Sequence, residues 1–250
     1  MSRAVPVVDV VVLTWNDGEL LDRALASVLA SEGVDVRAVV VDNGSEPPAA
    51  VPDDSRVRLI RNPENRGVAA GRNQGAAIGS APFVCFLDSD ARLLPDALPR
   101  LLIPLGDPQV ALSAPVFVGQ PAEASAGRAP SLSDKALRLL DVRSTYRPVT
   151  ADGPWWDVDF AIGACQLVRR SSFEAVGGFD QSYFYGPEDV DLCLRLREAG
   201  KRVVQVEGAE CHHPPRRRNR RLLTRRGMLH ASAVARHLWR HRGFTRRVAA

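Results

Sequence analysis

Long hydrophobic runs are missing from this 250-residue sequence. A helix that crosses a membrane needs about 20 apolar residues in a row, and no segment reaches that length. The N-terminus also lacks the basic stretch followed by an apolar stretch that marks a secretion signal, because its most apolar segment, Val7–Leu13, is short and includes Asp9. These absences argue against a membrane-spanning or secreted protein.

Cysteine is scarce, and its spacing matches no metal or redox motif. The four cysteines never occur as C-x-x-C, and each lies in an apolar or mixed context. We therefore expect reduced and mostly buried thiols in a cytoplasmic protein.

Two glycine-rich nucleotide-binding motifs are also absent. Leu13–Gly18, which follows the first predicted strand, contains no G-x-G-x-x-G, and this disfavours an NAD-dependent dehydrogenase. The same segment has no glycine-rich loop with a lysine or arginine, as a nucleotidyltransferase would need. A nucleotidyltransferase of similar fold nevertheless stays the alternative enzyme.

Acidic residues are missing from the C-terminal part of the chain. No aspartate or glutamate follows Glu210, whereas 12 arginines lie between Arg216 and Arg247. Residues 1–210 carry 21 basic and 29 acidic side chains, so an acidic body precedes a strongly basic tail. Such a tail binds phosphates, membranes or nucleic acid, or stays solvated.

The hydrophobic pattern predicts alternating strands and helices. Apolar runs predict strands over Val7–Thr14, Val36–Asp42, Val57–Arg61, Phe83–Asp88, Val110–Val118, Ala161–Arg169 and Arg202–Val206. Helical periodicity and capping signals predict helices over Glu19–Ser31, Val68–Ile78, Pro95 to about Leu105, Ser171–Gly177 and Pro187–Ala199. Alternation of this kind predicts an α/β fold, a Rossmann-like and mostly parallel sheet with helices on both faces.

Caps and one loop complete the predicted outline. Asp17 is expected to cap the first helix, and Ser171 and Glu174 form a capping box for a later one. Residues Gly119–Thr150 are rich in proline, alanine and serine, which predicts a mobile loop with one short helix near Asp134–Leu140. The predicted organisation is a domain over 1–214, with halves 1–118 and 151–214, and a basic helical tail over 215–250.

Polar side chains follow three of the predicted strands, at the point where each strand ends. Thr14-Trp15-Asn16 ends the first strand, Asp42-Asn43-Gly44-Ser45 the second and Asp88-Ser89-Asp90 the fourth. In an open parallel sheet, ligands bind beyond the carboxyl ends of the strands. We therefore expect a binding site at this edge.

The carboxylates of Asp88 and Asp90 suggest a bound cation. Carboxylates beside the apolar strand Phe83–Leu87 are costly unless something pairs with them, and a divalent cation prefers oxygen ligands. A magnesium or manganese ion would bridge Asp90 to a diphosphate and neutralise both. The alternative for this Asp-x-Asp pattern is an ordinary surface turn.

Asp42, Asn65 and Arg72 each allow two interpretations. Asp42 either accepts a hydrogen bond from a nucleobase or ribose, or forms the turn before Asn43-Gly44. Asn65 and Arg72 either face the same edge of the sheet or belong to an ordinary helix start.

The acidic run near the start of the last predicted helix also has two interpretations. Glu188 and Asp189 either act in acid–base chemistry or stabilise the helix dipole. Asp191 is expected to pair with Arg195, four residues further along the helix.

These motifs together resemble the nucleotide-sugar-binding and catalytic regions of the family 2 glycosyltransferases, which have the GT-A fold. The motifs that carry the resemblance, in order along the chain, are Val11–Asn16, Val41–Ser45, Asn65–Asn73, Phe86–Asp90, Gly163-Ala164, Gly177–Asp180, Tyr185–Asp191 and Cys211–His213. They span most of the chain, and the subgroup that they resemble most is the rhamnosyltransferase type. Trp15 departs from the pattern, which more often has tyrosine or phenylalanine there.

The resemblance implies a role for each matching residue of the donor site. Thr14, Asn16 and Asp42 would hold the base and ribose, and Asp88 would support the ribose or the metal. Asp90 would coordinate the metal on the diphosphate. The other candidates for binding the nucleotide sugar are Asn65, Arg72 and Ser89.

The second half supplies the implied catalytic, metal and acceptor residues. Asp189 would be the general base, with Glu188 beside it. His212 or His213 would be a metal ligand, and the family pattern favours His212. The candidate acceptor-binding residues are Trp155, Trp156 and Gly163.

We therefore expect an inverting glycosyltransferase that uses a divalent cation, magnesium or manganese. Its donor would be a nucleoside-diphosphate sugar of the UDP or dTDP type, and its acceptor a hydroxyl of a glycan, a lipid-linked molecule or a small metabolite. The non-enzyme alternative is an adaptor that binds membranes or nucleic acid through the tail. That alternative gives no function to the carboxylates of Asp88, Asp90 and Asp189, so we expect no nucleic-acid partner.

The basic tail is expected to be helical, with arginines interleaved among Leu222, Leu223, Met228, Leu229, Ala233, Leu238 and Trp239. Such a helix either lies on an anionic membrane or docks its apolar residues on the catalytic domain. The first reading places the protein peripherally on the inner face of the membrane.

Overall fold

The computed structural model describes residues 5–127 and 154–214, together with residues 232, 233, 235–237 and 239–241 of the C-terminal segment. The predicted helix near Asp134–Leu140 and most of the predicted loop lie outside the described residues, as does much of the predicted basic tail. Among the described residues, no helix combines the length and the apolar character needed to cross a membrane.

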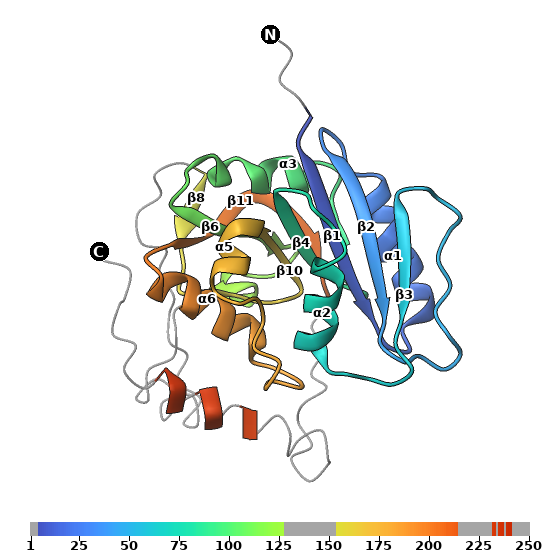
Figure 1. Ribbon diagram of the computed structural model, residues 1–250. Helices are drawn as coiled ribbons and strands as arrows, with labels where there is room; N and C mark the ends of the chain where they lie inside the picture. Colours follow the sequence, from blue (N-terminus) through green and yellow to red (C-terminus); the bar gives the residue numbers. More distant parts are fainter. Residues whose placement is uncertain (1–4, 128–153, 215–231, 234, 238, 242–250) are drawn as a thin grey trace.

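One large mixed sheet forms the centre of the molecule (Figure 1). Its strands lie in the order β3-β2-β1-β4-β10-β6-β11-β5, and β8 pairs with β11 beside this path. The strands are β1 (Val7–Thr14), β2 (Asp35–Asp42), β3 (Val57–Arg61), β4 (Phe83–Asp88), β5 (Arg92–Leu93), β6 (Val110–Phe117), β8 (Trp155–Asp157), β10 (Cys165–Arg169) and β11 (Arg202–His212). A separate short ribbon joins β7 (Ala126–Gly127) to β9 (Phe160–Ala161).

Helices cover both faces of this sheet, as the sequence predicts (Figure 1). They are α1 (Gly18–Leu29), α2 (Val68–Ala76), α3 (Ala97–Leu102), α5 (Arg170–Ala175) and α6 (Glu188–Glu198), with short 3₁₀ turns at Pro104–Gly106 and Ala122–Ala124. One core cluster packs α1 and α3 on the sheet, and the other packs α2, α5 and α6 on the opposite face. Strand β1 serves both, because Val10 and Val12 enter the first cluster and Val11 enters the second.

The sheet departs from the predicted parallel pattern at three strands, of which β5 and β8 run antiparallel to β11. β10 runs antiparallel to both of its neighbours, β4 and β6, whereas β3, β2, β1 and β4 are mutually parallel. The predicted strand Ala161–Arg169 is in fact split, since Phe160–Ala161 pairs with β7 and only Cys165–Arg169 enters the main sheet. Hydrophobicity marks a buried strand but not its direction, so the sequence pattern did not reveal this insertion.

The helix caps also differ from the prediction. Asp17 occupies the N-cap position of α1 but makes no capping hydrogen bond; its Oδ2 accepts one from Ser89 Oγ at 2.7 Å instead. The capping box at Ser171 does not form, because α5 already begins at Arg170. Arg170 fixes this start: its backbone N–H donates to Pro82 O, and its guanidinium pairs with buried Asp9 at 2.7 Å.

The last strand, β11, is longer than predicted. β11 continues to His212, with an irregularity in its pairing with β6 between Val206 and Glu210. Its end pairs with β5, where His212 lies opposite Arg92. This extension brings the two histidines close to the loop that follows β4.

Candidate active site

The ends of β1, β2 and β4 meet at one edge of the sheet, as predicted. Thr14 lies opposite Asp42 in the pairing of β1 with β2, and Leu13 lies opposite Asp88 in the pairing of β1 with β4. Because β10 is antiparallel to β4, the start of β10 lies at this same edge, and Asp88 N–H donates to Ala164 O at 3.0 Å. The polar loops therefore converge with Gly163 and Ala164.

Arg72 stands at the centre of this edge and joins the two halves of the site. Its side chain is only 3% exposed. One terminal nitrogen donates to Asp88 Oδ1 and to Gly163 O, both at 2.7 Å, and the other pairs with Glu188 Oε1 at 3.2 Å. We call Arg72, Asp88, Glu188 and Asp189 the arginine–carboxylate cluster.

Helix α2 holds Arg72 there because it packs unusually close to the sheet. A Cβ on Gly71 would lie 2.4 Å from Leu13 Cδ1, and one on Gly75 would lie 2.4 Å from Val11 Cγ1. Glycine at both positions therefore lets the helix backbone approach β1.

Gly163 connects Arg72 to the start of α6. Its N–H donates to Asp189 Oδ2 at 2.8 Å, and its carbonyl accepts from Arg72. A Cβ at this position would lie 2.7 Å from an Arg72 nitrogen and 3.0 Å from Asp189 Cβ. The structure therefore places this predicted acceptor residue beside Arg72 and Asp189 of the arginine–carboxylate cluster.

Burial controls the protonation of the two acidic residues at the start of α6. Burial raises the pKa of Glu188 to about 7; the Asp189 charge adds to the rise and Arg72 opposes it. The Oε2 atom of Glu188 is buried without a hydrogen-bond partner among the described residues. Burial also raises the pKa of Asp189, although hydrogen bonds from Gly163 and Val190 act against it.

The charges of the cluster keep Arg72 ionised. Burial by itself lowers the pKa of Arg72, but Asp88, Glu188 and Asp189 outweigh it and raise the pKa above its ordinary value. A carboxylate whose pKa is raised by burial is a common feature of general bases.

Asp90 belongs to a second group of side chains, which shares Asp88 with the first. Ligand atoms of Asp88, Asp90 and His213 all lie within 4.8 Å of one another. His213 Nε2 is 3.6 Å from Asp90 Oδ1, and its ring lies 5.0 Å from that of Phe117. Two carboxylates and one imidazole suit a divalent cation.

The family pattern favours His212 as the metal ligand, but the structure favours His213. His212 is the exposed last residue of β11, and it is absent from the group of possible ligands. Side chains alternate between the two faces of a strand, so neighbouring histidines at its end point to different sides. A motif of two adjacent histidines does not reveal which one faces Asp90.

Two of the predicted nucleotide-binding residues, Asp42 and Asn16, accept hydrogen bonds from the loop that follows β2. Asp42 is buried, and its two carboxylate oxygens accept from Ser45 N–H at 2.8 Å and Ala49 N–H at 2.9 Å. Asn16 has a positive φ of 59°, and its Oδ1 accepts from Glu46 N–H at 2.7 Å. Thr14 Oγ1 is buried without a hydrogen-bond partner among the described residues.

A network of amides supports the neighbouring loop. Asn65 Oδ1 accepts from Asn43 Nδ2 at 3.0 Å and from Gly67 N–H at 2.9 Å. Asn43 Oδ1 accepts in turn from Asn62 Nδ2 at 3.1 Å. The sequence analysis did not single out Asn62; its place directly after β3 was the available signal.

The two tryptophans among the predicted acceptor residues lie on β8, which pairs with the middle of β11. Trp156 is 9% exposed and belongs to the core, where its indole donates to Gln205 Oε1 at 3.0 Å. Trp155 packs against the other core cluster. Among the described residues, neither tryptophan shares a hydrogen bond or an ion pair with the arginine–carboxylate cluster.

The predicted pairing of Asp191 with Arg195 is present, at 2.7 Å. The four cysteines are free and buried, as predicted.

Comparisons with known proteins agree on one protein family. The model of glycosyl transferase family 2 matches residues 9–177. A pre-mycofactocin glycosyltransferase of Mycobacterium tuberculosis is 34% identical over 232 residues, which cover 91% of this chain and 47% of that protein. The chain therefore spans about half of the length of that relative.

Two further relatives are named as rhamnosyltransferases. The N-acetylglucosaminyl-diphospho-decaprenol L-rhamnosyltransferase of M. tuberculosis is 31% identical, over 83% of this chain and 76% of that protein. Rhamnosyltransferase WbbL of Escherichia coli is 37% identical over 45% of this chain and 43% of its own length. The predicted resemblance to rhamnosyltransferase-type enzymes is confirmed.

Solved structures share the fold. A mannosyltransferase from Pyrobaculum calidifontis, in complex with GDP-Man and Mn²⁺, superposes with a TM-score of 0.60 at 20% identity, over 84% of this chain and 57% of that one. GalNAc-T7 with UDP, GalNAc and Mn²⁺ gives a TM-score of 0.69 at 15% identity, over 95% of this chain and 48% of that one. The predicted GT-A fold is confirmed.

Proposed function

Because the chain belongs to glycosyl transferase family 2, we propose that it transfers a sugar from a nucleoside-diphosphate sugar to an acceptor hydroxyl. The observation that carries this proposal is the convergence of two groups at one edge of the sheet. The arginine–carboxylate cluster supplies a base, and Asp90 with His213 supplies cation ligands next to it. Asp88 belongs to both groups, so donor binding and chemistry share one residue.

The donor in this proposal binds at the loops that follow β1, β2 and β4. Thr14, Asn16 and Asp42 face the base and ribose, and Asn65 and Ser89 support the loops around them. Both carboxylate oxygens of Asp42 already accept one backbone hydrogen bond each, and each has a second lone pair for a ligand. The buried hydroxyl of Thr14 provides a further polar atom at the end of β1.

The diphosphate in this proposal is held with a divalent cation. The residues fit such an ion, since Asp88, Asp90 and His213 present oxygen and nitrogen atoms within 4.8 Å of one another. Asp88 Oδ1 is engaged by Arg72, so Asp90 and His213 would be the principal ligands. Bound there, magnesium or manganese would stabilise negative charge on the departing diphosphate.

Asp189 is proposed as the general base of an inverting transfer. It takes the proton of the acceptor hydroxyl while the acceptor oxygen attacks the anomeric carbon and the nucleoside diphosphate leaves from the opposite face. Gly163 N–H orients Asp189 through Oδ2. Glu188, whose pKa is raised to about 7 by burial, supports Arg72 and limits the negative charge beside the base.

The donor and acceptor follow from chemistry and from the relatives. We propose a UDP or dTDP sugar, in keeping with the rhamnosyltransferases among the relatives. The acceptor is a hydroxyl of a glycan, a lipid-linked molecule or a small metabolite, reached near Gly163 and the start of α6.

The cation site is tested by isothermal titration of UDP and dTDP into the protein, with manganese and with chelator. Asp90→Asn and His213→Ala should abolish the manganese-dependent gain in affinity, because each removes a ligand. His212→Ala removes an imidazole from the adjacent position and should keep that gain. Full manganese dependence in Asp90→Asn, or loss of it only in His212→Ala, would contradict the proposal.

A further inference from the structure

A helical segment near the C-terminus docks on α6, where His241 contacts Asp191 and Glu198. Residues 232, 233, 235–237, 239 and 240 are helical, and Ala233 and His237 are buried. Arg236 donates to Ser182 O at 2.6 Å, and Arg240 pairs with Asp180. This segment therefore contacts both α6 and the loop that leads into it.

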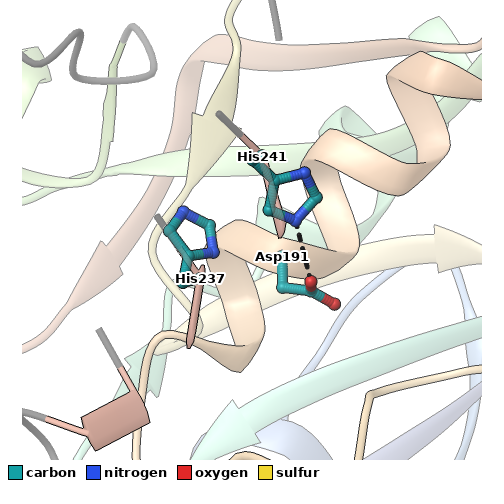
Figure 2. A group of neighbouring side chains, drawn as sticks. All are labelled: Asp191, His237 and His241. Carbon is teal, nitrogen blue, oxygen red and sulfur yellow. Dashed lines mark hydrogen bonds and ion pairs between the residues drawn. The ribbon is translucent and has the colours of Figure 1, made fainter. Parts of the chain in front are cut away.

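Two histidines of this segment meet one aspartate of α6. His237 and His241 are four residues apart, which places them on the same face of a helix. Ligand atoms of Asp191, His237 and His241 all lie within 4.8 Å of one another, and Figure 2 shows both rings beside the carboxylate. The site is closed to solvent, since the side chains of Asp191 and His241 are 0% and 4% exposed and His237 is 6% exposed.

We propose that Asp191, His237 and His241 form a second metal site, of the zinc type, which fastens the C-terminal helix to α6. The ion would lie between Asp191 Oδ1 and the two imidazoles and would replace the direct contact of 2.9 Å between Oδ1 and His241 Nε2. Two histidines four residues apart on one helix are a familiar pair of zinc ligands. Three protein ligands and one water complete a tetrahedral zinc site.

The surroundings hold these ligands in the orientation that a metal requires. Asp191 Oδ2 accepts from Arg195 Nε at 2.7 Å, so the carboxylate is fixed with Oδ1 toward the imidazoles. His241 Nδ1 lies 3.1 Å from Glu198 Oε1. A carboxylate on the far nitrogen of a ligating histidine is the usual outer support of a zinc site, because it fixes the tautomer and the ring.

The local charge also allows a divalent cation. Asp180, Asp191 and Glu198 contribute negative charges, and Arg195 and Arg240 balance part of them. Arg240 lies 3.8 Å from Asp191 Oδ1, farther than from Asp180. Tyr183 Oη, at 3.4 Å from the same oxygen, is a further polar neighbour. Neither contact is short enough to occupy the ligand position.

The two cation sites differ in chemistry and should select different ions. Two imidazoles with one carboxylate favour zinc and other late transition metals, whereas two carboxylates with one imidazole suit magnesium or manganese. Asp191 lies two residues after Asp189 on α6, so a metal here would stabilise the helix that presents the base.

The test uses the full chain with Asp90→Ala, which removes the other cation site. Cobalt(II) serves as the spectroscopic probe for zinc. We expect one cobalt equivalent per chain with the intense visible absorption of a low-coordinate ion, displaced by added zinc. His237→Ala in the same background should lose this absorption, whereas His212→Ala should retain it.

A second variant allows the proposal to be tested even if His237→Ala does not fold. Glu198 is 48% exposed at its side chain, so Glu198→Gln should fold and should weaken cobalt binding by roughly tenfold to a hundredfold. The proposal is overturned if the Asp90→Ala protein shows no such absorption, or if His237→Ala retains it. It is also overturned if Glu198→Gln changes neither the cobalt absorption nor the resistance of the C-terminal helix to protease. In that case ion pairs alone hold the helix on α6.

Discussion

At the scale of single residues, Arg72 links the two halves of the candidate site through its hydrogen bonds and ion pairs. It is buried and contacts Asp88, Glu188 and the carbonyl of Gly163. Removing one partner of a buried ion pair leaves an uncompensated charge and typically costs about 3–5 kcal/mol. The pairs therefore matter for the geometry of the site more than for net stability, because burying the charges is itself expensive.

Glu188 gives this cluster a measurable pH dependence. Its pKa is raised from 4.5 to about 7 by burial, so the folded protein binds a proton in this range that the unfolded chain releases. Its contribution to stability is fully present below pH 4.5 and is lost as the pH rises through about 7. The loss is on the order of 3 kcal/mol.

We therefore predict that Glu188→Gln becomes more stable relative to the wild type as the pH rises from 4.5 to 8. Urea unfolding of both proteins across this range measures the difference in free energy of unfolding. Glu174→Gln, which removes an exposed carboxylate on α5, should show a constant difference. Parallel pH profiles for Glu188→Gln and the wild type would show that burial does not shift this group.

At the scale of elements, the close packing of α2 on the sheet places Arg72. A Cβ on Gly75 would lie 2.4 Å from Val11 Cγ1 and 3.1 Å from Val41 Cγ2. Both contacts involve stiff β-branched side chains, so α2 would have to move outward. Gly18, on the first turn of α1, has nothing within 4 Å of such a Cβ.

Gly75→Ala should therefore destabilise the protein by about 1–3 kcal/mol through overpacking, despite the better helix propensity of alanine. Gly18→Ala is the matched control and should be neutral or stabilising by up to about 1 kcal/mol. Thermal or urea unfolding measures both. Equal stability of the two variants would mean that α2 is not held tightly against β1.

Most elements of this fold were readable from the sequence, because β1 and β4 are buried apolar runs that end in polar motifs. The direction of β10 was not, since a short buried strand has the same composition whether it runs parallel or antiparallel. The sequence left the choice between His212 and His213 open for a related reason: it depends on which face of β11 each side chain takes at an irregular strand end. The predicted cap at Asp17 does not form because this side chain accepts a hydrogen bond from Ser89 instead. The predicted cap at Ser171 does not form because the helix begins one residue earlier, at Arg170, which pairs with Asp9.

At the scale of the whole molecule, an acidic body precedes a basic C-terminal segment in the sequence. The described helical residues contact α6 through His237 and His241, in agreement with the docked alternative. Leu222, Leu223, Met228 and Leu229 lie outside the described residues. Trp239 is 67% exposed.

Docking does not exclude contact with a membrane, and we keep peripheral association as a proposal. Each arginine near an anionic surface adds on the order of 1 kcal/mol, screened by salt. Co-sedimentation with anionic vesicles should show binding at low salt that weakens steeply as salt rises, and neutral vesicles should bind little. No sedimentation at low salt would rule out this role and would favour a soluble acceptor.

The proposed sugar transfer depends most directly on Asp189 as its general base. Asp189→Asn is nearly isosteric and can still accept from Gly163 N–H, but it is a very poor base.

The most direct measurement is kcat for sugar transfer by Asp189→Asn, together with the Kd of the donor nucleotide. The predicted result is a fall in kcat of about a hundredfold or more, with the Kd close to that of the wild type; Glu19→Gln, at an exposed position on α1, should change neither. A variant that keeps more than about a tenth of the wild-type kcat would contradict a general base at this position.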